Sequence, residues 1–405
     1  MRPFTSTIPF AEALRQVLAA ARPIDRTEQI LLAAADGRVV AADVHATVDV
    51  PAFDRSAMDG YAVVAADTID ATPDRPRSLA CVARAFTGQM PSRAVMPGEC
   101  VEIATGAPMP AGADAVVMVE ETAPGDAGII RVRARVQPRQ NVGPRASDLA
   151  QGQRVVRAGQ SLTPSRVGAL AATGLTHVAV YAKPKVTLIS TGDEVVDPGQ
   201  PLEPGQVYNI NRVTMQSVVA RHGGEAVALR TAGDSLEALG NVINSTVDCD
   251  VLVFSGGSSV GDRDLVLDVL RDRGRVQFHG IAVKPGKPTA FGHIGRTPVF
   301  AMPGNPTSCL SNAYMLLAPF LRCVARLPEW RPFTIDAPLA RRITSTADRH
   351  QFFTVRLVDG RAEPAFKSSG DITSMADAEG YIEIPAQTDV VEAGTVVTVT
   401  LFEYR

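Results

Sequence analysis

Cysteine and histidine are scarce in this 405-residue chain, and neither forms a recognisable cluster. The five cysteines are odd in number and widely spaced, and no C-x-x-C pair occurs. The sequence therefore predicts reduced thiols, as expected in the cytoplasm. Because the six histidines form neither an H-x-x-x-H pattern nor a Cys/His cluster, a structural zinc site is not expected.

Long apolar runs and a net positive charge are also missing. The apolar runs are much shorter than the ~20 residues that a membrane-spanning helix requires. Residues 1–23 have the pattern of an amphipathic helix rather than of an export signal. The formal charge of −3 provides no overall basic field for nucleic acid. We therefore expect a cytoplasmic globular protein of two to four domains that binds neither membrane nor nucleic acid.

The pattern of the N-terminal half predicts two domains. Ala and Leu recur at helical spacing in residues 10–45, and a helical pattern returns in residues 147–178. We predict one discontinuous helical domain made of residues 1–45 and 147–178. Residues 46–146 are rich in Pro, Gly and short Val/Ile alternations, which predicts a β-rich domain inserted into the helical one.

Two further domains are expected in the C-terminal half. Strand-like and helical stretches alternate in residues 179–327, which predicts an α/β domain with a mostly parallel sheet and helices on both faces. The stretch KPGKPTAFGHI leads to another strand rather than a helix, so a mixed sheet stays open. Residues 328–405 hold only short strands and turns, which predicts a small β-barrel or compact sandwich. The fold class is thus multidomain α/β and β.

Polar loops follow five predicted strands of the α/β domain and form the candidate site. Their sequences are TGDE, AGDS, SGGSSVGDRD, KPGKP and PGNP. Because ligands bind outside the carboxyl ends of the strands in an open α/β sheet, we expect the five loops to meet at one edge. The candidate ligand-binding residues are Thr191, Gly192, Asp193, Gly256, Gly257, Ser258, Ser259, Gly261, Asp262, Pro285, Gly286, Pro303, Gly304 and Asn305.

The chemistry of these loops indicates an anion site with a divalent cation. Backbone N–H groups of Gly and Ser approach an anion closely. Lys284 and Lys287 add two positive charges, in a chain with only five lysines. Carboxylates are oxygen ligands for Mg²⁺, and a cation between them and a phosphate would remove their repulsion. The candidate Mg²⁺ ligands are Glu194, Asp234 and Asp264.

A simpler interpretation of each acid stays open. Asp234 and Asp262 could be only helix N-caps. The Gly-rich loop fits neither the G-x-G-x-x-G nor the P-loop pattern. The hypothesis of an oxyanion site therefore depends on all five loops together.

Six motifs in order along nearly the whole chain resemble the molybdopterin molybdenumtransferase family, which includes the E domain of gephyrin. They are FDRSAMDGYAV, TGAPMPAGADAVVMVE, TGDE, SGGSSVGDRD, KPGKP and MPGNP. The resemblance implies insertion of molybdate into adenylated molybdopterin, with release of AMP and a requirement for a divalent cation. It also implies an elongated homodimer of four-domain subunits, and a molybdopterin adenylyltransferase that supplies the substrate.

The resemblance also implies roles for individual residues. Asp59 would reach the pocket from another domain or from the dimer partner, and Asp148 is the matching acid of a second loop. The segment 256–259 would cradle the terminal phosphate of the pterin side chain, and Ser374 matches a serine of the last domain. The residues with implied catalytic roles are Asp59, Asp148, Glu194, Asp234, Asp264, Lys284 and Lys287. The chain departs from the family pattern at Arg55, Ala146, Ser147 and Glu379.

Two alternative functions stay open. The gephyrin fold also serves as a scaffold, so the chain could bind pterin without turnover. The related adenylyltransferase carries a similar SGG…GD loop, but it is about the size of residues 180–326 alone. Formation of AMP from adenylated pterin, Mg²⁺ and molybdate would separate the enzyme from the scaffold.

Overall fold

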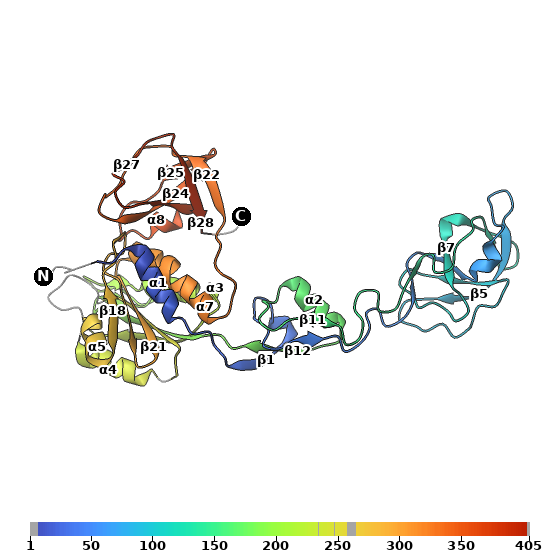
Figure 1. The fold of residues 1–405 in the computed structure, drawn as a ribbon, viewed down its shortest axis with the longest axis horizontal. Helices are drawn as coiled ribbons and strands as arrows, with labels where there is room; N and C mark the ends of the chain where they lie inside the picture. Colours follow the sequence, from blue (N-terminus) through green and yellow to red (C-terminus); the bar gives the residue numbers. More distant parts are fainter. Residues whose placement is uncertain (1–6, 234, 247, 257–264, 403–405) are drawn as a thin grey trace. The chain divides into compact units, whose positions relative to one another are not determined.

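The computed structural model describes residues 7–402 apart from residues 234, 247 and 257–264 (Figure 1). The chain divides into two compact units. We call the first the α/β unit; it comprises Met1–Glu28, Gly37–Val39 and Tyr181–Arg405. We call the second the β unit; it comprises Gln29–Asp36 and Val40–Val180. Within the described ranges, every helix is too short or too polar to cross a lipid bilayer.

The α/β unit is built on a six-stranded sheet. Its strand order is β16 (Glu225–Ala232), β13 (Lys185–Thr191), β17 (Val251–Ser255), β21 (Thr297–Met302), β20 (Ala290–Ile294) and β18 (Arg275–His279). The first four strands are parallel, and β20 is antiparallel to both of its neighbours. The sheet is therefore mixed, because a tight turn at Gly295, with φ of +60°, returns β20 directly into β21.

Helices cover both faces of this sheet (Figure 1). Val186 and Val253 face one helical layer, whereas Ile189 and Leu252 face the other, as the two-residue period of a strand requires. The first layer contains α1 (Phe10–Ala20), α3 (Ile210–Arg221), α6 (Pro306–Asn312), the π-helical turn η4 (Ala313–Leu317) and α7 (Ala318–Val324). The second layer contains α4 (Leu236–Ser245) and α5 (Leu265–Arg273).

A second sheet of the α/β unit comes mostly from residues after 333. Its order is β19 (Val283–Lys284), β24 (His350–Val358), β26 (Gly380–Ile384), β28 (Val396–Leu401) and β22 (Thr334–Pro338), with β25 (Arg361–Pro364) paired to β24. In chain order, β19 comes between β18 and β20 of the first sheet, but it belongs to the second sheet. There, Lys284 of β19 pairs with Gln351 of β24. The segment that carries Lys284 and Lys287 therefore connects the two sheets. Smaller elements here are β14 (Val195–Val196), β15 (Val207–Tyr208), β23 (Ile343–Thr344), β27 (Val390–Val391) and α8 (Thr373–Ala376).

The helical prediction for residues 21–45 is wrong. The segment forms β1 (Thr27–Leu31), the 3-10 turn η1 (Leu32–Ala34) and β2 (Val44–His45). Leu32, Ala35 and Val40 are buried in one apolar cluster of the β unit, so tertiary packing overrides the helical propensity of an Ala-rich stretch. α1 packs in the core of the α/β unit.

The β unit contains a six-stranded sheet. Its order is β7 (Ala115–Met118), β4 (Gly60–Val63), β6 (Glu99–Ile103), β5 (Arg77–Ala85), β9 (Ile129–Val132) and β8 (Thr122–Pro124). Residues 46–146, all of which are described, contain no α-helix. α2 (Pro164–Ala172) begins where Thr163 accepts a hydrogen bond from the Arg166 N–H. The remaining elements are η2 (Ala65–Thr68), η3 (Val119–Glu121), β3 (Arg55–Ser56), β10 (Val142–Gly143), β11 (Arg154–Val156) and β12 (His177–Tyr181).

Candidate functional site

A pocket of about 1270 Å³ opens at the carboxyl ends of β13, β17 and β21. This is the edge at which an open α/β sheet binds ligands. The start of α3, the loop between β19 and β20, and the start of α6 complete the wall on the side of the first sheet. Residues 349 and 366–370, which lie next to strands of the second sheet, also line the pocket.

Eleven of the predicted site residues line this one pocket. They come from four separate segments that the sequence analysis expected to meet. They are Thr191, Gly192, Glu194, Gly256, Lys284, Pro285, Gly286, Lys287, Pro303, Gly304 and Asn305. The structure therefore brings both predicted lysines and one predicted acid to the same cavity.

Other predicted residues lie outside the described part of the chain or outside the pocket wall. Those that the structure does not describe are Asp234, Gly257, Ser258, Ser259, Gly261, Asp262 and Asp264. Asp193 is exposed and adjoins the wall without lining it. Glu194 is thus the one described member of the predicted Mg²⁺ set. Among described residues, no three His, Cys, Asp or Glu side chains come close enough to hold a metal ion.

Asp59 and Asp148 belong to the β unit. Asp59 Oδ1 accepts a 2.8 Å hydrogen bond from the Thr105 N–H. The N–H of Asp148 donates to the Val50 carbonyl at 3.0 Å, and its side chain is exposed. Both carboxylates are therefore presented on the surface of their own unit, and their predicted catalytic roles stay predictions.

The glycine at the end of β17 is required by close backbone approach. Gly256 has φ of +95°, and a Cβ there would lie 2.8 Å from both the carbonyl oxygen and Oγ1 of Thr191. A Cβ on Gly304 would lie 3.5 Å from Gly256 Cα. Glycine is therefore required at position 256, where a Cβ would clash with Thr191, whereas a Cβ on Gly304 would make only an ordinary contact.

A buried hydroxyl–amide network supports the floor of the pocket. Asn209 Nδ2 donates to Ser190 Oγ at 2.9 Å, and Ser255 Oγ lies 3.4 Å from the same oxygen. Asn209 Oδ1 also accepts from the Arg212 N–H at 3.0 Å and so caps α3. These three residues were not singled out from the sequence, although two serines at the ends of buried strands are a signal that could have found them.

Two further polar atoms of the floor have no hydrogen-bond partner among the described residues. They are Thr191 Oγ1 and Asn211 Oδ1. Asn211 Nδ2 donates to the Gly304 carbonyl at 2.8 Å, which fixes the orientation of the amide. Because a buried polar group without a partner is costly, these two atoms are candidate contacts for a ligand N–H group.

The second sheet contributes cations that the sequence analysis missed. Arg349 and Lys367 line the same pocket as Lys284 and Lys287. Three of the chain's five lysines therefore line one cavity. The segment KSSGD, which begins at Lys367, has the Gly/Ser composition of the other pocket loops, and this signal was available in the sequence.

Ser374 does not line the pocket but supports a segment that does. Its side chain is fully buried. Ser374 Oγ accepts a 2.9 Å hydrogen bond from the Lys367 N–H and lies 3.5 Å from the Ser368 carbonyl oxygen. In the structure the hydroxyl is used within the protein, and the predicted ligand-binding role of Ser374 stays a prediction.

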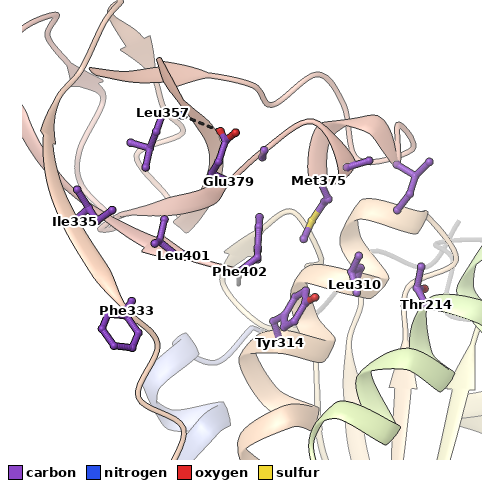
Figure 2. A pocket seen from close by; sticks show the side chains of 13 residues that line it. Thr214, Leu310, Tyr314, Phe333, Ile335, Leu357, Met375, Glu379, Leu401 and Phe402 are labelled. Atoms are coloured by element: carbon purple, nitrogen blue, oxygen red, sulfur yellow. Dashed lines mark hydrogen bonds between the residues drawn. The ribbon is translucent and has the colours of Figure 1, made fainter. Parts of the chain in front are cut away.

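A second pocket, of about 640 Å³, has a different character (Figure 2). It lies between α6, η4 and the second sheet, and side chains such as Leu310, Met375 and Phe402 line it. Glu379, one of the departures from the family pattern, accepts the Leu357 N–H at 2.8 Å there. No lysine or arginine is among its described lining residues. The cation-lined cavity is therefore the better candidate for an anionic substrate.

Family models match three consecutive parts of the chain. Residues 8–174 match the MoeA N-terminal region (domain I and II). Residues 187–323 match a probable molybdopterin binding domain, and residues 336–402 match the MoeA C-terminal region (domain IV). The matched central region contains the strands and most of the loops that form the cation-lined pocket.

Full-length relatives show the same similarity. Molybdopterin molybdenumtransferase 2 of Mycobacterium tuberculosis is 35% identical over 395 residues, covering 94% of this chain and 95% of that protein. Molybdopterin molybdenumtransferase of Haemophilus influenzae is 32% identical over 388 residues, again covering 94% and 95%.

Solved structures agree with these relatives. A molybdopterin biosynthesis MoeA protein of Pyrococcus horikoshii superposes with a TM-score of 0.83 at 37% identity, covering 99% of this chain and 100% of that one. A second such structure has a TM-score of 0.80 at 30% identity, covering 98% and 100%. The chain belongs to the molybdopterin molybdenumtransferase (MoeA) family.

Proposed function

We propose that this chain is a transferase of molybdenum cofactor biosynthesis that inserts molybdate into adenylated molybdopterin and releases AMP. The observation that carries the proposal is the convergence of Lys284, Lys287, Lys367 and Arg349 on one pocket at the strand ends. A cavity with these cations suits a substrate that carries phosphates together with an oxyanion. The names of the relatives support the same reaction.

Positioning and charge compensation are the contributions that the chain's own residues can make. Lys284 and Lys287 would hold molybdate beside the dithiolene sulfurs of the pterin and offset its negative charge. Arg349 and Lys367, which line the same pocket, would hold phosphate oxygens. Thr191 Oγ1 and Asn211 Oδ1 would accept N–H groups of a heterocycle, because neither has a partner among the described side chains or backbone.

The predicted Mg²⁺ remains part of the proposal. Mg²⁺ is commonly held by one or two carboxylates together with substrate phosphates and waters, so Glu194 on the pocket wall suits this role. When bound, the ion would polarise the pyrophosphate of the adenylated pterin as a Lewis acid. Asp234 and Asp264 are the other proposed ligands.

The remaining features implied by the family are proposed with the reaction. They are a homodimer, a cytoplasmic location, the four domain boundaries given above and closure of the second sheet into a small barrel. Asp59 and Asp148 would act on the pocket of their own subunit or of the partner. A molybdopterin adenylyltransferase would supply the substrate.

AMP release tests the proposed reaction directly. The purified chain is incubated with adenylated molybdopterin, Mg²⁺ and increasing molybdate, and AMP is quantified by chromatography. We expect AMP formation that saturates with molybdate and falls to background when molybdate is omitted. Tight binding of the pterin without molybdate-dependent AMP would instead support the scaffold alternative and overturn the proposal.

A further inference from the structure

The loop that carries Lys284 and Lys287 is held from behind by two buried polar side chains, Asn312 and Thr289. Asn312 is the last residue of α6, and Thr289 directly precedes β20. Both are fully buried, and neither lines the pocket. We propose that Asn312 and Thr289 are positioning residues that set the affinity of the lysine pair for a tetrahedral oxyanion. The proposal rests on the function proposed above and extends it to residues with no contact to the ligand.

The hydrogen bonds converge on one carbonyl group in the middle of the lysine loop. Asn312 Nδ2 donates to the Gly286 carbonyl at 2.9 Å, and Thr289 Oγ1 donates to the same oxygen at 2.9 Å. Asn312 Nδ2 also donates to Thr289 Oγ1. Both amide hydrogens and the hydroxyl hydrogen are therefore used, and the Gly286 carbonyl is bound by two donors.

The orientation of the Asn312 amide follows from its partners. A carbonyl oxygen only accepts hydrogen bonds, so the group facing Gly286 must be the NH₂ group. Asn312 Oδ1 has no partner among the described residues. The side chain thus keeps one buried acceptor unsatisfied, at a free-energy cost, to place two donors against the loop.

The absence of a side chain at Gly286 leaves room for Asn312. Its φ is +108°, and a Cβ there would lie 2.3 Å from Asn312 Nδ2. Any other residue would push the amide away from the loop or move the loop into the pocket. The glycine between the two lysines is therefore explained by the side chain behind it.

Hydrogen bonds from backbone N–H groups hold the carbonyl of the next residue, Lys287. The Lys287 carbonyl accepts hydrogen bonds from the Thr289 N–H at 2.9 Å and the Ile281 N–H at 3.0 Å. On the other side of the loop, Lys284 pairs with Gln351 of β24. The backbone of both lysines is consequently tied by hydrogen bonds.

Fixing the backbone matters because lysine is a flexible ligand. Its ammonium group is a point charge at the end of a four-carbon chain, so binding an anion orders several torsions. If the backbone were mobile as well, two lysines would bind one anion at a larger entropic cost. Asn312 and Thr289 therefore act through preorganisation and not through contact with the anion.

Steady-state kinetics with four variants test this proposal. Asn312→Leu and Thr289→Val remove the donors at similar volume, Thr289→Ser keeps the hydroxyl, and Ser311→Ala is the matched control. Ser311 is buried on the same helix, but its hydroxyl lies 3.4 Å from Met375 Sδ, away from the loop. We expect Asn312→Leu and Thr289→Val to raise KM for molybdate about tenfold while changing KM for the adenylated pterin less than twofold. Thr289→Ser and Ser311→Ala should remain close to the wild-type values.

Direct binding separates positioning from a general structural role. Molybdate binding is measured by equilibrium dialysis for Asn312→Leu and Lys287→Ala, alone and combined. If Asn312 acts through the lysine loop, the combined loss of affinity is smaller than the product of the single losses. A multiplicative loss, or an equal rise of both KM values, would overturn the proposal. If Asn312→Leu does not fold, the test depends on the Thr289 variants. The proposal then requires that Thr289→Val, and not Thr289→Ser, raises KM for molybdate.

Failure of the proposed function gives a different result. A wild-type chain that releases no AMP with molybdate refutes the function whatever the variants do. A wild-type chain that releases AMP, with molybdate KM unchanged in Asn312→Leu and Thr289→Val, refutes only the positioning role.

Discussion

Asn305 and Ser369 lie 64 residues apart in the chain, and Asn305 Nδ2 donates a 3.0 Å hydrogen bond to Ser369 Oγ. The Thr307 N–H also donates to the Ser369 carbonyl at 3.1 Å, and Thr307 Oγ1 donates to the Asp371 carbonyl at 2.8 Å. The loop after β21 is therefore fastened to the segment that carries Lys367. These bonds make one pocket wall from two sheets.

Removing the Ser369 hydroxyl should weaken substrate binding more than folding. The bond is exposed, so Ser369→Ala should lower the free energy of unfolding by no more than about 1 kcal/mol. Because the freed segment lines the pocket, we expect KM for the adenylated pterin to rise several-fold. Steady-state AMP release and urea unfolding check the two parts, with Ser245→Ala on α4 as a control distant from the pocket. An unchanged KM would show that the contact between Asn305 and Ser369 does not support substrate binding.

Replacing both pocket lysines should abolish the reaction without abolishing substrate binding. In Lys284→Ala/Lys287→Ala, we expect no molybdate-dependent AMP release, because the charges that hold the oxyanion are gone. Binding of the pterin substrate should remain measurable by fluorescence or calorimetry, since Arg349 and Lys367 stay in place. Lys183→Ala, an exposed lysine outside the pocket wall, is the matched control. Normal turnover in the double variant would show that neither lysine belongs to the catalytic site.

Asp250 should stabilise the α/β unit through its ionised form. Its carboxylate accepts from Arg26 Nη1 at 2.8 Å and Nη2 at 2.7 Å, and from the Lys185 N–H at 2.7 Å. Burial raises the pKa of Asp250, but the bonds from Arg26 and Lys185 outweigh it, and the net pKa lies below the ordinary 3.8. Since Arg26 is half-exposed, we expect Asp250→Asn to cost only about 1–2 kcal/mol.

The pH dependence of this effect has a defined sign. A carboxyl whose folded-state pKa is depressed stabilises the protein above its unfolded pKa, and this contribution is lost as the pH falls through the folded value. The difference in melting temperature between wild type and Asp250→Asn should therefore be constant near pH 7 and shrink below about pH 4. A difference that grew in acid would contradict this assignment.

His222 should destabilise the protein in mild acid. The ring is fully buried at the end of α3 and packs edge-on against Trp330, with ring centroids 4.9 Å apart. Burial first, and then repulsion by Arg322 and Arg221, lowers the pKa of His222 from 6.5 to about 4. The unfolded chain therefore takes up the proton first, so stability falls as the pH drops from about 6.5 towards 4.

The matched variant for this prediction is His222→Phe, which keeps an aromatic ring and removes the titration. Between pH 7 and pH 5, wild type should lose roughly 2 kcal/mol more stability than the variant. Chemical unfolding at both pH values measures the difference. Equal losses in the two proteins would show that the pKa of His222 is the same in the folded and unfolded states.

Much of the first sheet and its pocket could be predicted from the sequence. Buried runs such as KVTLIS and DVLVFS specify strands, and polar residues that directly follow parallel strands must lie at the same edge. For this reason Thr191, Gly256, Lys284 and Asn305 were expected together and line one pocket. These inferences needed only local patterns and the geometry of parallel strands.

Residues 21–45 show where local patterns were insufficient. An Ala- and Leu-rich stretch has helical propensity, but propensity amounts to a few tenths of a kcal/mol per residue. Burial of Leu32 and Val40 in an apolar cluster outweighs it and selects strands and a 3-10 turn. The same limit applies to α1, whose place in the α/β unit depends on contacts with distant residues.

The sequence by itself determined which residue types end the strands, where glycine is needed and which family the motifs resemble. Only the tertiary structure showed that Arg349 and Lys367 line the same pocket as the lysine loop, and that Asn312 binds the backbone of that loop. The physical reason is that strand and loop patterns are short-range properties of the chain. Contacts between the two sheets arise from packing. No local periodicity in the sequence predicts which distant side chains will be in contact.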